Sequence, residues 1–220
     1  MIYFFADDHF ETHPGLNIFQ GLPPMLAQSI RFYENDWTML ESGEWLKDCD
    51  LLVLNMIGTT CGLPHPGKGA EAAVKAWCER GGNMLLLHGS SAAFWHWDWW
   101  RTIVGMRWVR PEDPDGVETS VHPHSPYTLR KCKTRHPLME RLVEIALPED
   151  EIYTKLEQVQ PVTVFLDTFI ETGSFPQCFE SMTPWGGKCL SFLPGHSPDV
   201  TTHPVIRRTI STLIDYLMEK

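Results

Sequence analysis

The chain has 220 residues, of which 43% are apolar, and this length and composition suit one α/β domain over residues 1–220 with a sizeable core. Its 28 acidic side chains outnumber its 18 basic ones, giving a formal net charge of −10, which argues against nucleic acid or an anionic membrane as partner. The sequence has no apolar run long enough to span a bilayer, and its first residues lack the basic region of a signal peptide, so we expect a cytoplasmic location.

The first half of the sequence alternates short apolar runs with amphipathic segments. Residues 2–6 are a continuous apolar run, and residues 50–56 contain one over 51–54, which indicates strands buried on both faces. Residues 23–33 are predicted to be helical, with proline near the start, and residues 37–40 to form a short strand. Apolar residues then recur at helical spacing over residues 70–78, which predicts an amphipathic helix.

The segment that follows this helix is the most informative in the chain. Gly81 and Gly82 end the helix, and the run 84–87 is wholly apolar and bounded by glycine, which indicates a buried central strand. The strand stops at His88. Ser90 or Ser91 is predicted to cap a further helix that extends to about residue 104.

The second half is less regular at first. The proline-rich stretch 106–150 predicts loops, short strands and one helix near residues 137–143. Strands at 162–168 and 177–182 indicate a hairpin, and a strand over 188–193 leads to His196. A final amphipathic helix begins at the His203-Pro204 pair. The order of elements predicts a parallel sheet with helices on both faces.

Polar residues gather where three of the predicted strands end. His88 and His196 each follow a strand, and the first strand is followed by Asp8, His9 and His13. Open parallel sheets bind ligands beyond the carboxyl ends of their strands. We therefore expect the imidazoles of His88 and His196 to converge on one pocket, although a structural role for each in closing the sheet is also open.

Two further segments have both structural and functional interpretations. The acidic run 149–151 is typical of a solvated loop, but Asp150 or Glu151 is able to act as a general base or to orient a histidine if the loop folds over the strand ends. Four tryptophans lie between residues 95 and 100 and cannot all face one core. They favour self-association into a homo-oligomer over a sugar-stacking platform, in which Trp95 would take part.

The six cysteines are scattered and include no Cys-x-x-Cys pair, so a thiolate zinc site is not expected. Most are expected to be reduced and buried. Cys61 lies in a glycine-containing loop and is the candidate if one of them is a nucleophile.

Several of these segments occur in the order found in one protein family. They are 81–89, His136-Pro137-Leu138, Asp150-Glu151-Ile152-Tyr153, and 187–196. In these segments the chain resembles the ThuA-like (trehalose utilisation) family, a branch of the class I glutamine amidotransferase-like superfamily. The resemblance implies a flavodoxin-like three-layer α/β/α sandwich with a mostly parallel central sheet, and a link to sugar metabolism.

The chain departs from the amidotransferase pattern at one decisive place. Amidotransferases of the superfamily place a cysteine in a Gly-x-Cys-x-Gly elbow after the equivalent strand, whereas the turn here is His88-Gly89-Ser90-Ser91. A Cys-His-Glu triad is therefore missing from its expected position. A Gly-x-Ser-x-Gly hydrolase elbow is missing as well.

Three functions follow from these observations. The first is an enzyme for a small carbohydrate, in which His88, Glu151 and His196 act as acid/base groups or as ligands of one divalent ion such as zinc. The residues expected to contact its substrate are Asp8, His9, His13, Ser90 and Trp95. The second is a catalytically inactive amidotransferase-like protein that binds sugar or serves as a scaffold. The third is a cysteine hydrolase that uses Cys61.

Overall fold

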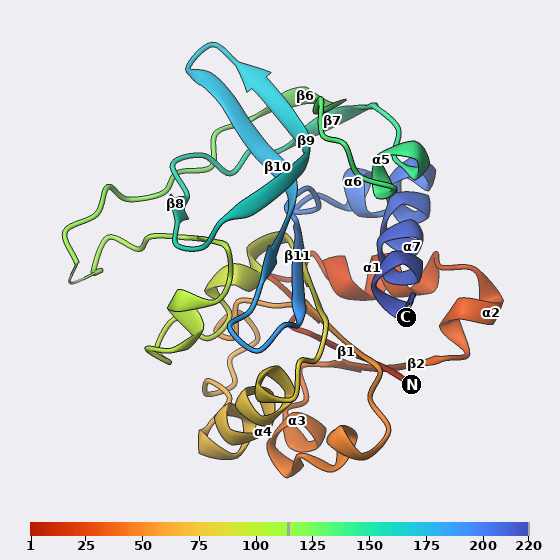
Figure 1. Ribbon diagram of the computed structural model, residues 1–220, viewed down its shortest axis with the longest axis vertical. Helices are drawn as coiled ribbons and strands as arrows, with labels where there is room; N and C mark the ends of the chain where they lie inside the picture. Colours follow the sequence, from red (N-terminus) through yellow and green to blue (C-terminus); the bar gives the residue numbers. More distant parts are fainter. Residues whose placement is uncertain (114, 220) are drawn as a thin grey trace.

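The centre of the molecule is a run of parallel strands buried on both faces. The structure is a computed structural model that describes residues 1–113 and 115–219. Within these residues the parallel strands lie in the order β2-β1-β3-β4-β11 (Figure 1). Their bounds are β1 Ile2–Ala6, β2 Ile30–Glu34, β3 Leu51–Asn55, β4 Met84–Leu87 and β11 Lys188–Phe192. The continuous apolar runs of the sequence therefore form the centre of the sheet, as predicted.

Antiparallel strands extend the same sheet beyond β11, in the order β10-β9-β6-β7. They are β6 His124–Lys131, β7 Ile145–Glu151, β9 Val162–Ile170 and β10 Gly173–Met182. The predicted hairpin is confirmed as β9 and β10, whose strands are longer than expected. A separate small pairing joins β5 Met106–Arg107 to β8 Glu157–Gln158.

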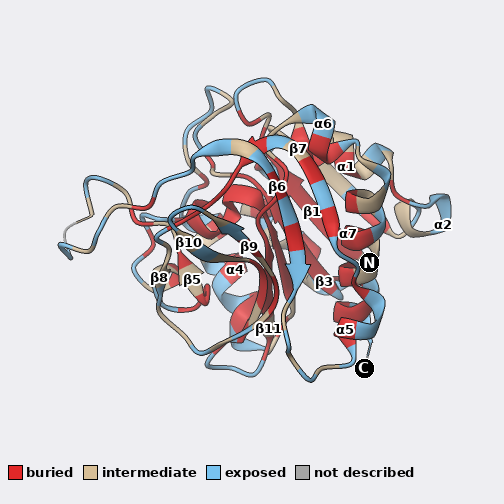
Figure 2. Ribbon diagram, turned by 90° about the horizontal axis from the view of Figure 1, so that it is seen from above, coloured by how far each residue is buried: buried red, intermediate tan, exposed pale blue. Residues whose placement is uncertain are grey.

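Strands β6 and β7 form an arm that leaves the plane of the sheet. Strand β6 pairs with β9 only through Arg130 and Lys131, and the rest of it pairs with β7. Burial alternates along both strands, whereas the parallel strands β1, β3 and β4 are buried throughout (Figure 2). The inward side chains, among them Tyr127 and Leu147, join the core on one face of the sheet. We refer to β6 and β7 together as the antiparallel arm.

Helices cover both faces of the parallel strands, which confirms the three-layer architecture. Side chains of α1 (Pro14–Gln20), α6 (Pro198–Thr201) and α7 (Pro204–Met218) pack on one face, and those of α3 (Thr38–Ser42) and α4 (Lys68–Glu79) pack on the other. The remaining short helices are α2 (Pro24–Ala27), α5 (Leu138–Arg141) and the 3₁₀ helix Glu44–Lys47. Within the described residues, the helices are too short or too polar to cross a bilayer.

Two predicted elements near the N-terminus are wrong, and one helix was not foreseen. Residues 23–33 form only the four-residue helix α2 before the chain enters β2, because Ile30, Phe32 and Tyr33 favour an extended edge strand beside β1. Helix α1, which precedes them, was not predicted. Residues 37–40 begin helix α3, where the Asp36 carboxylate accepts a hydrogen bond from the Thr38 N–H at 2.9 Å.

The helix predicted from Ser90 to about residue 104 is also replaced by other structure. The segment consists of turns and two 3₁₀ helices, His88–Ala92 and Trp100–Thr102. Its aromatic rings pack on one another and on the sheet: Trp97 stacks on Phe94 with centroids 3.9 Å apart, and the Trp100 indole donates to the Ser91 carbonyl. Burying such bulky neighbouring rings outweighs a regular helical ladder.

Residues 106–150 contain longer strands than the prolines suggested. Pro126 lies within β6 at a break in the ladder, between the pairs made by Ser125 and Tyr127, which is where a sheet tolerates a missing N–H. The helix expected at 137–143 is the four-residue α5. The acidic run near residue 150 lies at the end of β7 rather than in a loop.

Candidate functional site

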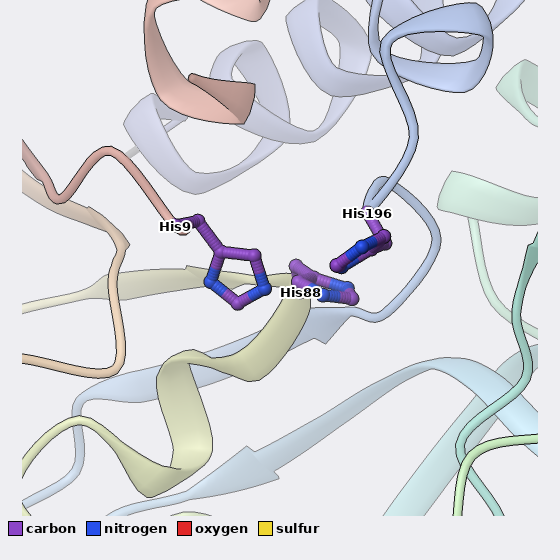
Figure 3. A group of neighbouring side chains, drawn as sticks. All are labelled: His9, His88 and His196. Atoms are coloured by element: carbon purple, nitrogen blue, oxygen red, sulfur yellow. The ribbon is translucent and has the colours of Figure 1, made fainter. Parts of the chain in front are cut away.

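Three histidines converge at the carboxyl edge of the parallel strands. His9 follows β1, His88 follows β4 and His196 follows β11, and their rings face a common space (Figure 3). The ring centroids are 4.8 Å apart for His9 and His88, 5.2 Å for His9 and His196, and 5.6 Å for His88 and His196. The expected convergence of His88 and His196 is thus present, and His9 completes a group of three.

The backbone at two of these histidines is strained. His9 has φ +46° and His88 has φ +52°, a left-handed conformation that costs a residue with a Cβ roughly 1–2 kcal/mol. The segment after β1 continues in this conformation at Phe10 and Glu11. Such strain persists where the surrounding structure enforces it, and it is concentrated at functional sites.

The glycine after His88 permits a close approach from the other side. A Cβ on Gly89 would lie 2.6 Å from Ile57 and 3.1 Å from the Tyr153 hydroxyl. The absence of a Cβ at Gly89 therefore leaves room for Tyr153 beside the buried His88 ring.

A carboxylate from the antiparallel arm enters this histidine cluster. Glu151 ends β7, and its Oε2 lies 3.4 Å from Nε2 of His88. Its Oε1 lies 3.1 Å from Nδ1 of His122, 3.5 Å from Nε2 of His124 and 3.4 Å from Nδ1 of His196. One buried carboxylate thus faces four imidazoles, two of them half-exposed.

The topology explains why the arm meets the parallel strands here. Each antiparallel pairing reverses the strand direction, so the four pairings from β11 through β10, β9 and β6 return β7 to the direction of β11. The carboxyl end of β7 and the amino end of β6 therefore lie at the same edge as the three histidines. Glu151 and His124 occupy those ends.

The hydrogen bonds of His88 determine which ring nitrogen bears the proton and which one faces Glu151. The Leu193 carbonyl lies 2.9 Å from Nδ1 and can only accept, so Nδ1 bears the proton. In a neutral ring, Nε2 then presents a lone pair to the Glu151 carboxylate, with the Tyr153 hydroxyl 3.3 Å away. The lone pair of His88 Nε2 and the carboxylate of Glu151 repel each other at 3.4 Å. A proton on Nε2 or a metal cation between the two groups would remove this repulsion.

Burial and mutual charge set the protonation of the cluster. Burial, followed by the neighbouring His88 and His196, lowers the pKa of His9 to about 2, so its ring is neutral near pH 7. Burial would raise the pKa of Glu151, but His88 and the other histidines outweigh it and lower that pKa to about 2. Burial would lower the pKa of His88, but Glu151 outweighs burial and raises it.

Asp150 positions His196 through backbone hydrogen bonds. Its buried carboxylate accepts backbone N–H bonds from Gly195, His196 and Ser197 at 2.8, 3.0 and 2.8 Å. These bonds fix the loop after β11 to the end of β7. Of the two acids considered from sequence, Asp150 is therefore the orienting group, and Glu151 is the one that faces the histidines.

The donor set is suited to a divalent ion. Nitrogens of His9, His88 and His196 lie within 4.8 Å of one another, as do donor atoms of His122, His124 and Glu151. Neighbouring ligands of tetrahedral zinc, at bonds of about 2.0–2.1 Å, are separated by about 3.3 Å. The distances from Glu151 to the four imidazoles are close to that separation, and the Leu193 carbonyl supplies the outer hydrogen bond that metal-ligating histidines usually make.

A cavity of about 230 Å³ opens beside the cluster. His9, Glu151, Tyr153 and His122 line one part of it, and Trp108 and Arg110 line another. A second cavity of about 320 Å³ adjoins it, sharing Ala92, Trp108 and Arg110 with the first. The site therefore continues from the histidines toward the tryptophan-rich segment.

The residues expected to contact substrate from sequence fall into different places. His9 lines the first cavity, and Trp95, 42% exposed, lines the second. Asp8 exchanges hydrogen bonds with Asn35, and His13 pairs with Glu34 at 3.0 Å. Ser90 is buried, accepting from the Met56 N–H and donating to the Leu87 carbonyl. The last three are not among the residues that line either cavity.

Sequence reasoning missed His122, His124, Tyr153 and Arg110. The two histidines lie in the proline-rich stretch 106–150, which was not assigned to the site. Their i, i+2 spacing around Pro123 is nevertheless the pattern that places two side chains on one face of an extended segment. That spacing, together with Glu151 one β-hairpin later, was the available signal.

Cys61 has the surroundings of an unactivated thiol. It is half-buried, packs against the core on the α4 face and is not among the residues lining either cavity. Burial raises its pKa, whereas reactive cysteines have a lowered one.

Comparisons with known proteins agree with this architecture. The family model for ThuA, described as trehalose utilisation, matches residues 7–217. A ThuA-like protein from Parabacteroides merdae superposes with a TM-score of 0.74 at 13% identity, covering 99% of this chain and 88% of that one. A ThuA-like protein from Bacteroides uniformis gives 0.68 at 14% identity, covering 99% and 91%.

A more distant likeness is to PurLQS from Thermotoga maritima, with a TM-score of 0.53 at 10% identity and 98% of each chain covered. Curated proteins give no sequence match. At these identities the structural likenesses concern the fold alone.

Proposed function

The chain belongs to the ThuA family of trehalose utilisation, and from that premise we propose that it is an enzyme acting on a small carbohydrate at a histidine–carboxylate centre that binds one divalent ion such as zinc. The observation that supports the proposal is the convergence of His9, His88 and His196 beside Glu151 at the rim of a cavity. Neutral imidazoles and a carboxylate are the ligands of catalytic zinc centres that keep one position open.

In this proposal His9, His88 and His196 bind the ion, with Glu151 as the adjoining carboxylate. The ion, when bound, supplies Lewis acidity toward a hydroxyl or carbonyl oxygen of the sugar. Glu151 accepts a proton from the substrate, since its low pKa keeps it ionised near neutral pH. His122 and His124 contact its Oε1 and are half-exposed, so they exchange that proton with solvent.

In this proposal the Tyr153 hydroxyl orients the His88 ring. It lies 3.3 Å from Nε2 of His88 and lines the cavity. Burial and the nearby carboxylates raise its pKa well above the usual value, so it stays a hydrogen-bond donor throughout the neutral range. It also lies close to Gly89, where a Cβ would be 3.1 Å from it.

One observation favours a second candidate, a sugar-binding protein without turnover. The turn after β4 is His88-Gly89-Ser90-Ser91, and it lacks the cysteine that the resemblance to amidotransferases would place there. The turn thus presents no thiol nucleophile. Under this alternative, the chain binds a sugar but converts none.

Measuring the metal content of purified variants tests whether the histidines bind an ion. Asparagine tolerates positive φ, so His9→Asn and His88→Asn remove an imidazole with little added backbone strain. His13→Asn is the matched control, because His13 also has positive φ (+50°) but pairs with Glu34. We expect about one zinc per chain in the wild type and in the control, and at least a tenfold loss of affinity in the other two variants. Equal metal content in all four proteins would contradict the metal centre.

Turnover tests the enzyme. The zinc-loaded protein is incubated with a panel of mono- and disaccharides and their oxidised and phosphorylated derivatives, and products are detected by mass spectrometry. We expect conversion of at least one sugar that is abolished by a chelator and in His88→Asn, and retained in His13→Asn. Binding without conversion by any member of the panel would favour the second candidate.

A further inference from the structure

Arg110 differs from the other arginines around the second cavity. Arg107 pairs with Asp113, Asp115 and Glu157, and Arg101 pairs with the same two aspartates. Among residues 1–113 and 115–219, Arg110 takes part in no ion pair, and its Nε is buried without a hydrogen-bond partner. Glu112, two residues away, is exposed and lies beyond ion-pair distance.

The orientation of Arg110 is fixed by a neighbouring ring. Its guanidinium lies over Trp95, 4.9 Å from the ring centroid. Stacking on an aromatic face immobilises the guanidinium plane and leaves its edge free to donate in the bidentate pattern that matches carboxylate and phosphate oxygens. The sequence expectation that Trp95 stacks on a sugar thus changes, since one face of the ring is already covered by Arg110.

The position of Arg110 connects it to the histidine cluster. It lines both the cavity beside Glu151 and the adjoining cavity under Trp95. Burial lowers its pKa, and the charge of Glu112 acts in the opposite direction without forming an ion pair among the described residues. A desolvated, unpaired cation is costly, and an anionic ligand group at this point would offset the cost.

Resting on the proposed function, we infer that Arg110 is an anion-binding residue and that the ligand is an acidic sugar derivative, with its carboxylate or phosphate on Arg110 and its hydroxyls toward His9 and Glu151. The exposed Asp98 and Glu112 at the second cavity then act against anions that approach from that side. Neutral sugars would bind the same cavity more weakly, because they leave the guanidinium unpaired.

The test is direct binding by calorimetry to three ligands that share one ring: glucose, glucuronate and glucose 6-phosphate. Wild-type protein is expected to bind at least one acidic ligand about tenfold or more tightly than glucose. The tighter of the two acids identifies carboxylate or phosphate as the natural group. Arg110→Gln should remove this preference and leave glucose affinity within about twofold, whereas Arg110→Lys should retain part of it.

Arg101→Gln is the matched control, since it removes an arginine from the same cavity that already has carboxylate partners. It should leave the preference intact. If Arg110→Gln fails to fold, Arg110→Lys and the wild-type preference still decide the question. Equal affinity for acidic and neutral ligands, an equal loss for both in Arg110→Gln, or no binding of any of the three would overturn the inference.

The same titrations on zinc-free His88→Asn separate this inference from the proposed function. A preference for acids that persists there, in a protein without turnover or metal, leaves Arg110 as the anion site even if the enzymatic proposal fails. Conversely, metal-dependent turnover of neutral sugars only, unaffected by Arg110→Gln, would support the proposed function and exclude the anion site.

Discussion

The parallel strands and the antiparallel arm contribute opposite properties to the site. The parallel strands β1, β4 and β11 end in three imidazoles, of which His9 and His88 are buried on a strained backbone. The arm contributes the Glu151 carboxylate and the half-exposed His124, and the half-exposed His122 lies just before it. The parallel strands thus supply imidazole donors, and the arm supplies a carboxylate and a side chain that reaches solvent.

The largest expected effect comes from separating the two regions at Asp150. Asp150→Ala leaves three buried backbone N–H groups of the 195–197 loop without their acceptor. We expect the free energy of unfolding to fall by about 3 kcal/mol, measured by urea denaturation. The control is Glu149→Ala, which removes an exposed neighbouring carboxylate and should change stability by less than about 0.5 kcal/mol. Similar losses in both variants would show that the arm is not joined to the parallel strands through Asp150.

A second test ranks the arm's own ligands. Glu151→Gln should weaken zinc binding by about 10- to 100-fold, because the carboxylate contacts two of the three proposed histidine ligands, His88 and His196, whereas His124→Asn should weaken it by less than about tenfold. Titration calorimetry on the metal-free proteins measures both. A larger loss in His124→Asn than in Glu151→Gln would place the ion in the arm rather than at the parallel strands.

The acid sensitivity of the metal-free protein distinguishes the regions by pH. The pKa of His9 falls from about 6.5 in the unfolded chain to about 2 in the folded one, so between these values the unfolded chain binds more protons and stability falls as the pH falls. The window from pH 6.5 to 5 contains this effect together with those of His65, His96 and His196, whose pKa values burial also lowers, so comparison with a His9 variant is needed to isolate His9. Glu151 loses its stabilisation only below about pH 4.5, and the raised pKa of His88 acts only above 6.5.

Over that window His9 should account for about 1.5 kcal/mol of lost stability, estimated from proton linkage. His9→Asn should therefore lose about that much less than the wild type when urea unfolding is repeated at the two pH values in the presence of a chelator. Parallel curves for the two proteins would show that His9 is protonated in the folded state.

The smallest expected effect concerns Cys61, the nucleophile candidate of the parallel half. Its raised pKa predicts that iodoacetamide at pH 7.5 labels it no faster than it labels free cysteine, as followed by mass spectrometry. Labelling about tenfold faster than free cysteine would restore the cysteine hydrolase as a candidate.

Sequence periodicity was sufficient for the parallel half. The apolar runs of β1, β3, β4 and β11 are buried on both faces, and a short apolar run of this kind predicts a central strand. His88 and His196 could be expected to meet because parallel strands bring their carboxyl ends to one edge. The helices predicted from weak patterns were wrong where tertiary packing determines the local structure, as at the short edge strand β2 and in the tryptophan-rich turns after His88.

The arm could not be predicted in the same way. Placing Glu151 beside His88 depends on four antiparallel pairings and on the departure of β6 from β9 after two residue pairs. The spacing of residues along the sequence predicts none of these pairings. The unpaired state of Arg110 depends likewise on which acids Arg101 and Arg107 occupy.

The conformation at residue 88 has a consequence for how chemistry changes within such folds. Because the left-handed turn after β4 aims whatever side chain it bears at Glu151 and His196, the scaffold and the reagent are separable. A substitution at residue 88 therefore changes the group that faces Glu151 and His196, while the strands that hold the turn stay the same.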